Sequence, residues 1–264
     1  VARQCGGCQI QEMRYEAQLA FKQKMVQNNL ERIGGLSDFE MYPVIGMETP
    51  YAYRNKAQFP VGEDKDGNIV IGFYAGRTHH IVEQTDCCIG APENGEVLRK
   101  VKAYMQKNQI RPYNEEHHSG IVRHILIRTG YHTKEIMVCL IVNAAKASCL
   151  KNAEQLTESL REMDGMTSVM VNFNTEKTNV ILGKKSEVLW GQPYIEDFIG
   201  NVKYQISPQS FFQVNPMQTE KLYAKALEYA GLTGNETVWD LYCGIGTISL
   251  FLAKNARKVY GVEI

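Results

Sequence analysis

Apolar and polar residues alternate along many short stretches of the first part of the chain. Between them lie longer stretches in which apolar residues recur every three or four positions, as on the buried side of a helix. Alternating stretches, together with short continuous apolar runs, predict strands at residues 53–59, 69–74, 78–82, 121–129, 135–143, 168–174, 180–182, 187–190 and 202–206. The longer stretches predict helices at residues 9–33, 92–108 and 149–163. Helices mixed with antiparallel hairpins are typical of an α+β domain, which we expect over residues 1–206.

The pattern changes at Ser207, where a loop leads directly into a predicted helix. Asn215 is suited to cap this helix, Pro216 fits its first position, and Gln218 completes a capping box. Gly231 is suited to end it. Its expected buried side consists of Leu222, Ala226, Leu227 and Ala230. We expect this helix to lie over a ligand pocket formed by the residues that follow.

Residues 238–264 follow the order strand, glycine turn, helix, strand, with which a doubly wound, Rossmann-like α/β sheet begins. Gly244 lies in the turn, Asp240 stands at the end of the first strand, and Glu263 ends the second. Ligands bind such sheets beyond the carboxyl ends of the strands, where an acidic side chain accepts hydrogen bonds from ribose hydroxyls. Ser249 stands where a dinucleotide fingerprint has its third glycine. The pattern therefore favours S-adenosylmethionine, which has no pyrophosphate, with an NAD-dependent oxidoreductase as the alternative.

Three motifs resemble those of one enzyme family. They are Ser-Pro-Gln-Ser-Phe-Phe-Gln-Val-Asn-Pro at residues 207–216, Asp-Leu-Tyr-Cys-Gly-Ile-Gly-Thr at residues 240–247 and Cys-Gly-Gly-Cys-Gln at residues 5–9. Together they resemble the RNA (uracil-5-)-methyltransferases, the enzymes that make 5-methyluridine in ribosomal and transfer RNA. The resemblance implies that residues 207–264 are the first part of a class I methyltransferase domain. It implies contacts to S-adenosylmethionine at Gln213, Tyr242 and Glu263, to which the strand–turn pattern adds Asp240 and Gly244.

Seven cysteines occur in the chain, which does not open on a charged and then apolar leader. This usage does not favour a disulfide framework, and we expect a cytoplasmic protein. From the residues alone, a Cys-x-x-Cys motif is compatible with zinc, a redox pair, half an iron–sulfur site or simple packing. The family resemblance implies a [4Fe–4S] cluster held by Cys5, Cys8 and a distant cysteine. We assign the distant ligand to Cys87, with Cys88 as a close competitor, and place the family's remaining ligand two residues before Val1.

The chain carries 29 basic and 29 acidic residues, so its net charge is zero. No apolar run is long enough to span a membrane. A neutral chain does not favour nucleic acid, and the implied RNA partner therefore needs local clusters of positive charge. We expect phosphate contacts from Arg54 and Lys56 on one face of a predicted strand, although a solvated strand face is the simpler alternative. Arg123 and Arg128 are further candidates, and Phe211 is a candidate for stacking on a flipped-out uridine.

The resemblance implies a reaction in which a cysteine thiolate adds to C6 of uracil and C5 takes the methyl group. The family's nucleophilic cysteine and general base lie beyond Glu263, so we assign no catalytic residue in this chain and reject Cys243, which lies in the cofactor turn. We expect the chain to be part of a longer protein, without the family's N-terminal β-barrel domain, and to be inactive alone. The iron–sulfur motif favours 23S ribosomal RNA, with transfer RNA as the alternative substrate. A non-catalytic iron–sulfur RNA-binding module is the alternative of another class, and we expect a monomer.

Overall fold

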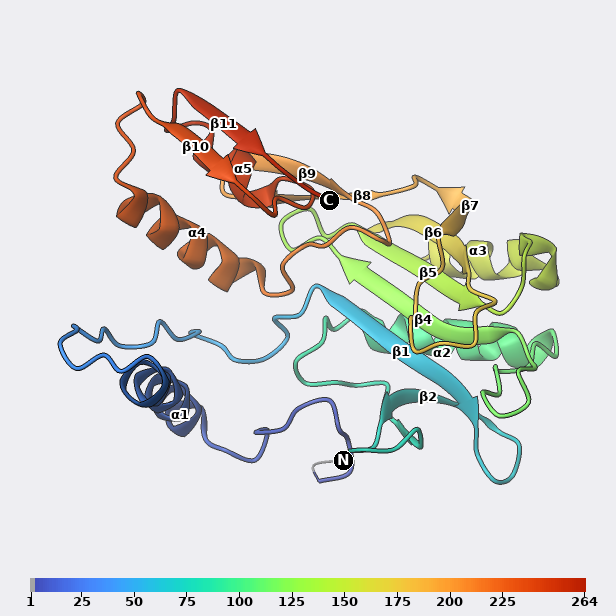
Figure 1. The fold of residues 1–264 in the computed structure, drawn as a ribbon. Coiled ribbons are helices and arrows are strands. Elements are labelled where there is room, and N and C mark those ends of the chain that lie inside the picture. The colour runs from blue at the N-terminus through green and yellow to red at the C-terminus, as the bar shows by residue number, and fades with distance from the viewer. Residues whose placement is uncertain (1–2) are drawn as a thin grey trace.

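The computed structural model describes residues 3–264, and most of its strands form one seven-stranded sheet (Figure 1). The strands of this sheet are β1 (Lys56–Glu63), β2 (Ile69–Tyr74), β3 (Ile81–Glu83), β4 (Val122–Thr129), β5 (Ile136–Val142), β6 (Met166–Phe173) and β7 (Lys185–Gly191). They lie in the order β3-β2-β1-β4-β5-β6-β7. β5 and β6 run parallel, and the other neighbours are antiparallel. This mainly antiparallel sheet with its helices confirms the predicted α+β class.

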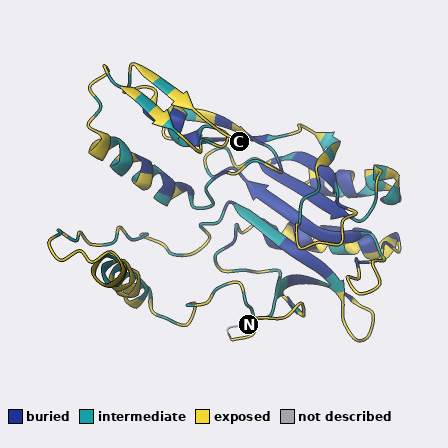
Figure 2. Cartoon of the chain, viewed as in Figure 1, coloured by how far each residue is buried: buried dark blue, intermediate teal, exposed yellow. Residues whose placement is uncertain are grey.

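Both faces of the central strands are covered. On one face, α2 (Asn94–Lys107) and α3 (Ala153–Arg161) contribute apolar side chains to a core with β1, β4, β5 and β6. On the other face lie the antiparallel strands β8 (Ile195–Ile199) and β9 (Val202–Ile206), together with Phe212 and Tyr223. Every residue of β4 and β5 is consequently buried (Figure 2). Two-sided burial explains why residues 136–142 form a continuous apolar run rather than an alternating one.

The last elements of the chain are α4 (Pro216–Ala230), β10 (Thr237–Asp240), α5 (Thr247–Leu252) and β11 (Lys258–Gly261). β10 and β11 pair in parallel, with Asp240 opposite Gly261. A strand, a helix and a parallel neighbouring strand confirm the predicted start of a Rossmann-like sheet. The residues of β10 and β11 are mainly exposed or half-buried (Figure 2).

The N-terminal helix is shorter than the pattern predicts. α1 (Tyr15–Asn28) continues into one turn of π-helix, η1 (Asn29–Ile33). Residues 9–12 form turns, and the Gln18 side chain donates hydrogen bonds to two carbonyl groups of that region, at 3.4 Å from Ile10 and 2.9 Å from Met13. These bonds compensate carbonyl groups that a longer helix would have used.

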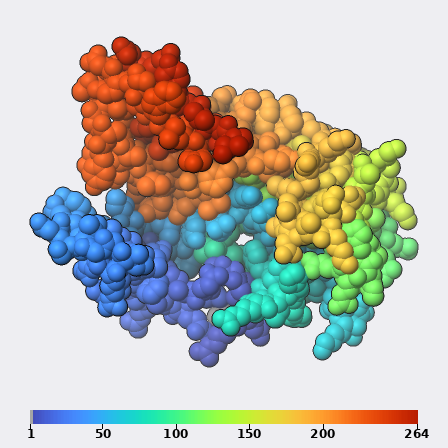
Figure 3. Space-filling model, viewed as in Figure 1, coloured from blue at the N-terminus to red at the C-terminus, as the bar shows by residue number. Residues whose placement is uncertain are grey.

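The segment after α1 connects the N-terminal helix to the C-terminal elements. Its Met47 N–H donates to the Tyr15 hydroxyl at 2.6 Å, and its Ile45 carbonyl accepts a hydrogen bond from the Gln218 side chain of α4 at 2.8 Å. The N-terminal helix (blue) and the C-terminal elements (orange to red) accordingly lie on one side of the molecule (Figure 3). No helix within residues 3–264 has both the length and the apolar composition needed to cross a membrane.

One predicted strand is wrong, and one observed strand was not predicted. Residues 180–182 form a loop, because the side-chain amide of Asn174 donates to the carbonyl oxygens of Val180 at 2.6 Å and Ile181 at 2.9 Å. β8 was not predicted, since Asp197 stands at a fully buried position where alternation calls for an apolar residue. The helix predicted at residues 149–163 is shorter in the structure, where α3 begins at Ala153 and ends at Arg161. A short 3-10 turn, η2 (Ala147–Cys149), precedes it.

The buried side of α4 also differs from the prediction. Pro216, Thr219 and Tyr223 are its buried residues, whereas Leu222 is 58% exposed. Ala226 and Leu227 are half-buried and Ala230 is exposed, so the predicted apolar side is only partly buried.

Candidate cofactor and nucleic-acid site

The carboxyl ends of β10 and β11 bring the predicted cofactor residues to one edge. The Val262 N–H donates to the Asp240 carbonyl oxygen at 2.8 Å, so the main chain after β11 still pairs with β10 where β10 ends. Glu263 follows, and its Oε2 accepts a hydrogen bond from the main-chain N–H of Gly244 at 2.7 Å. Tyr242 lies in the same turn and is 81% exposed. A carboxylate, a glycine turn and an accessible aromatic ring thus meet where such sheets bind ligands.

Ser249 has a role that the sequence reasoning missed. Its hydroxyl donates to Oδ2 of Asp240 at 2.6 Å, which ties the first turn of α5 to the end of β10. Gly246 has a φ of 79°, a conformation that disfavours any side chain. Cys243 packs closely against β11, since a Cβ on Gly261 would lie 2.9 Å from its Sγ. The half-buried Cys243 thiol therefore lies between the glycine turn and β11.

The loop of residues 207–215 lies against the central sheet. Arg128 donates from its guanidinium to the carbonyl oxygens of Pro208, at 3.3 Å, and Ser210. Phe212 is buried in the core, whereas Phe211 is 69% exposed. The main chain of the loop is therefore held against the sheet, while one aromatic ring is exposed to solvent. An exposed ring is what stacking on a nucleobase requires.

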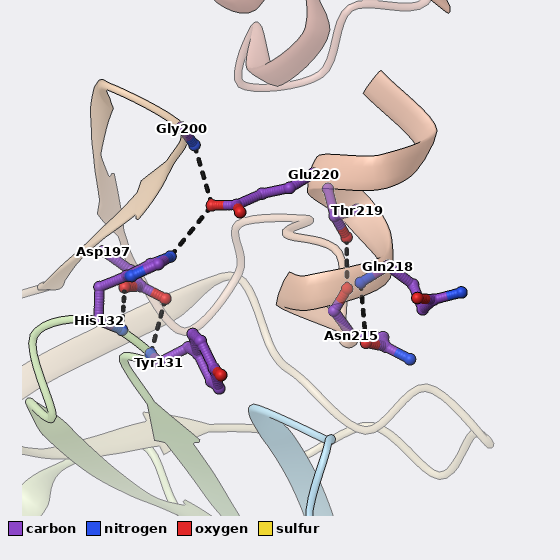
Figure 4. Close-up of polar contacts among 8 residues, drawn as sticks. All are labelled: Tyr131, His132, Asp197, Gly200, Asn215, Gln218, Thr219 and Glu220. Atoms are coloured by element: carbon purple, nitrogen blue, oxygen red, sulfur yellow. Dashed lines mark hydrogen bonds and ion pairs between the residues drawn. The ribbon is translucent and has the colours of Figure 1, made fainter. Parts of the chain in front are cut away.

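α4 begins directly after this loop, and its cap is formed as predicted. Asn215 Oδ1 accepts a hydrogen bond from the Gln218 N–H at 3.2 Å (Figure 4). The capping box is half-formed, because the Gln218 side chain bonds to Ile45 instead of returning to the cap. Further along α4, the Tyr223 hydroxyl lies 2.8 Å from that of Thr247, the first residue of α5. α4 thereby connects Gln213, which precedes it, to the glycine turn.

A polar network holds the start of α4 to the hairpins beside it (Figure 4). Glu220 Oε1 accepts hydrogen bonds from the Gly200 N–H at 3.1 Å and pairs with His132 Nε2 at 3.1 Å. The Asp197 carboxylate accepts the N–H groups of Tyr131 at 2.8 Å and His132 at 2.9 Å. The β4–β5 turn, the β8–β9 turn and α4 are therefore fixed to one another. The sequence gives no signal for this network, because its members come from three separate segments.

Two of the predicted cations lie side by side at the start of β1. Lys56 on β1 stands opposite Arg128 on the neighbouring strand β4. Both Arg54 and Lys56 are half-buried. Burial, with the neighbouring charges of Arg128 and Arg54, lowers the pKa of Lys56 to about 8. Neighbouring positive charges and partial burial disfavour the protonated form of Lys56. A bound anion such as a phosphate group would favour it again, so this position suits a contact to phosphate.

The other two predicted cations do not face solvent. Arg123 is 6% exposed, and its guanidinium donates to the carbonyl oxygens of Asn174, Glu176 and Thr178 at 2.7 to 3.3 Å. Arg128 is 2% exposed and holds the loop of residues 207–215, and burial lowers its pKa to about 10. The expectation that these two arginines meet RNA directly is therefore corrected: each guanidinium is used inside the fold to bind main-chain carbonyl groups.

The three cysteines predicted to bind a cluster line one cavity of about 230 Å³. Burial raises the pKa of the Cys8 thiol, and the neighbouring thiols of Cys87, Cys5 and Cys88 raise it further. Gly6 is required here, because a Cβ on it would lie 2.9 Å from the main chain of residues 74 and 76. Within residues 3–264, no group of three metal-binding side chains is arranged to hold a single metal ion. Iron–sulfur clusters are usually held by four cysteine thiolates, and three cysteines line this cavity.

Comparison with known sequences identifies one family. The family profile described as tRNA (Uracil-5-)-methyltransferase matches residues 14–264. A Bacillus cereus protein called an uncharacterized RNA methyltransferase is 50% identical over 265 aligned residues, which cover 100% of this chain and 57% of the relative. A relative from Halalkalibacterium halodurans with the same description is 51% identical, with the same coverage. The chain thus spans little more than half the length of these relatives.

A solved structure is similar over nearly the whole chain. It is that of Pyrococcus abyssi tRNA (uracil-54, C5)-methyltransferase in complex with S-adenosyl-L-homocysteine. The TM-score is 0.76 at 28% identity, and the similarity covers 95% of this chain and 56% of the other.

Proposed function

This chain belongs to the tRNA (uracil-5-)-methyltransferase family, and on that premise we propose that it forms the RNA-facing and first cofactor-binding parts of an enzyme that methylates C5 of uracil in RNA. Residues 1–206 are proposed as the α+β domain that meets RNA, and residues 207–264 as the first part of the methyltransferase domain. The methyl group comes from bound S-adenosylmethionine. The enzyme is proposed to act in the cytoplasm as a monomer.

One observation carries the cofactor assignment. The Glu263 carboxylate is held by the Gly244 N–H at the ends of two parallel strands, 2.7 Å from its donor. This bond occupies one oxygen and fixes the orientation of the other, so the carboxylate is prepared to accept ribose hydroxyls. We propose Tyr242 and Asp240 as neighbouring contacts and Gln213 as the contact from the loop before α4.

We propose that this chain contributes positioning rather than covalent chemistry. C5 of uracil becomes nucleophilic when a cysteine thiolate adds to C6, and a base must later remove the C5 proton. No residue described in this chain is assigned to either role. The exposed ring of Phe211 is proposed to stack on the flipped uridine, while Arg54 and Lys56 hold the backbone phosphates. Holding both reactants in line is a large part of catalysis for a group transfer of this kind.

We propose 23S ribosomal RNA as the substrate, and transfer RNA as the alternative. The cysteine motif favours the first. The second is favoured by the solved relative, which acts on uracil-54 of tRNA. A non-catalytic iron–sulfur RNA-binding module is the proposal of another class.

We further propose that Cys5, Cys8 and Cys87 bind a [4Fe–4S] cluster. The shared cavity and the mutual influence of the thiols support this assignment. When bound, the cluster would fix the N-terminal loop to the segment after β3. Anaerobic reconstitution followed by iron and sulfide analysis tests it: Cys8→Ser should lower the bound iron, whereas Cys149→Ser, a half-buried thiol elsewhere, should not.

The methyl-transfer proposal is tested with the protein made from its complete reading frame. It is incubated with methyl-labelled S-adenosylmethionine and unmodified total RNA, and the RNA is separated by size. We expect label in 5-methyluridine of the large ribosomal RNA; label in transfer RNA would select the alternative substrate. Glu263→Gln should weaken S-adenosylhomocysteine binding about tenfold, whereas the exposed control Glu228→Gln should not. An absence of label in any RNA, with the cofactor bound, would favour the non-catalytic module.

A further inference from the structure

Asn55 joins two parts of the candidate site that are far apart in the sequence. Its main-chain N–H donates to the Val214 carbonyl oxygen at 3.0 Å. Its side-chain amide donates from Nδ2 to the Gln213 carbonyl oxygen at 2.9 Å. One residue therefore binds two successive carbonyl groups in the loop that carries the proposed cofactor contact.

Asn55 is itself held firmly. It is 8% exposed, and its carbonyl oxygen accepts the N–H of Thr129, the last residue of β4, at 2.9 Å. On its N-terminal side, the Arg54 N–H donates to the Ile89 carbonyl oxygen and the Ala52 N–H to that of Cys88, each at 2.9 Å. Residues 52–55 thus lie between the loop of Cys88 and Ile89, the end of β4 and the loop of Gln213.

Only the N–H group of the Asn55 side-chain amide forms a hydrogen bond. Oδ1 of Asn55 is buried without a hydrogen-bond partner, so the amide contributes through Nδ2 alone. The loop of residues 207–215 contains no strand or helix that would fix Gln213 by regular main-chain pairing. Removing the Asn55 amide therefore frees the carbonyl of the residue whose side chain must meet the ligand.

We propose that Asn55 is a positioning residue for the cofactor site, which fixes the main chain at Gln213 and ties it to residues 52–55, which in turn bond to the main chain of Cys88 and Ile89. The inference rests on the proposed function, because it assumes that the Gln213 loop meets S-adenosylmethionine. Asn55 does not contact the cofactor itself; it acts through Gln213.

The test compares Asn55→Ala and Asn55→Asp with a matched control, in the protein made from its complete reading frame. Asn55→Asp keeps the shape but presents acceptors to the Gln213 carbonyl. The control is Asn108→Ala: Asn108 is 9% exposed, its Nδ2 also donates to one main-chain carbonyl, that of Tyr104 at 3.0 Å, and its Oδ1 accepts a hydrogen bond from Asn152 Nδ2 at 2.7 Å. Calorimetric binding of S-adenosylhomocysteine, the KM values for S-adenosylmethionine and RNA, and the melting temperature are measured for each.

We expect Asn55→Ala to weaken S-adenosylhomocysteine binding about tenfold and Asn55→Asp to weaken it further. The KM for S-adenosylmethionine should rise in parallel, while the KM for RNA and kcat change less than twofold. Asn108→Ala, which removes two side-chain hydrogen bonds, should lower the melting temperature at least as much as Asn55→Ala does and leave binding unchanged. Equal binding in wild type and Asn55→Ala, or an equal loss in Asn108→Ala, overturns the inference alone. A wild-type protein that binds no S-adenosylhomocysteine overturns the proposed function as well.

Discussion

Replacing Asp197 should destabilise the fold more than replacing any exposed acid of the same hairpin. Its carboxylate is fully buried in β8 and accepts two main-chain N–H groups of the β4–β5 turn, at 2.8 and 2.9 Å. Asp197→Ala leaves both N–H groups without an acceptor, at about 1–3 kcal/mol each. The variant no longer buries a carboxylate, which offsets part of this cost. We therefore expect a net loss of about 2–4 kcal/mol in the free energy of unfolding.

Denaturation of the 264-residue chain in guanidinium chloride, followed by circular dichroism, measures this loss. Asp197→Asn should lose less, since its remaining side-chain oxygen still accepts one N–H group. Glu196→Ala is the matched control, one position earlier on β8, where the side chain makes an exposed ion pair with Lys203; its effect should be much smaller. A loss below about 1 kcal/mol for Asp197→Ala would refute the reasoning, because the two hydrogen bonds would then not hold the turn.

Four other predictions follow from particular contacts. The pKa of Lys56 is lowered to about 8, so its charge is lost as pH rises through that value. We expect RNA affinity, measured by filter binding at constant ionic strength, to fall between about pH 7 and about pH 9 in the wild type but not in Lys56→Arg, which keeps its charge; a flat wild-type profile would contradict this. The same lowered pKa means that the unfolded chain binds the proton more tightly, so the contribution of Lys56 to stability should rise with pH from about 8 towards about 10.4; comparing urea midpoints of wild type and Lys56→Met across this range measures it. Tyr223→Phe should lower stability by about 1 kcal/mol, because the buried Thr247 hydroxyl loses its partner; an unchanged urea midpoint would show that this contact does not stabilise the junction of α4 and α5. Gly246→Ala should cost about 1–2 kcal/mol, since φ is 79° at this position; the thermal midpoint measures it, and an unaltered midpoint would mean that the turn relaxes.

The sequence predicts those features that depend on neighbouring residues. The Asn215 cap, the glycine turn and the two parallel strands each have a signal within a few positions, and the structure confirms them. The roles of Arg123 and Arg128 could not be read in this way. An arginine in an alternating strand gives the same pattern whether it faces solvent or binds carbonyl groups 51 or 82 residues later in the chain.

The role of Asn55 could not be predicted from the sequence either. It stands in a segment that draws attention for its cations, but its side-chain hydrogen bond joins residues separated by 158 positions. Residues that hold a site together at such separations follow no periodicity, because their position is set by the packing of whole elements rather than by local backbone geometry. The same holds for Glu220, which bonds to two turns that the sequence pattern treats as unrelated loops.

The burial of two arginines changes how a neutral chain is expected to meet RNA. Arg123 binds three carbonyl groups of residues 174–178, and the exposed side chain of Lys177 lies within that stretch. Arg128 holds the loop that presents Phe211, which is exposed. Neither guanidinium adds to the surface potential as a free cation would, yet each fixes a loop whose exposed residue suits RNA. On the proposed function, positive charge in this chain therefore acts partly through the shape it imposes, and net charge alone is a poor guide to an RNA partner.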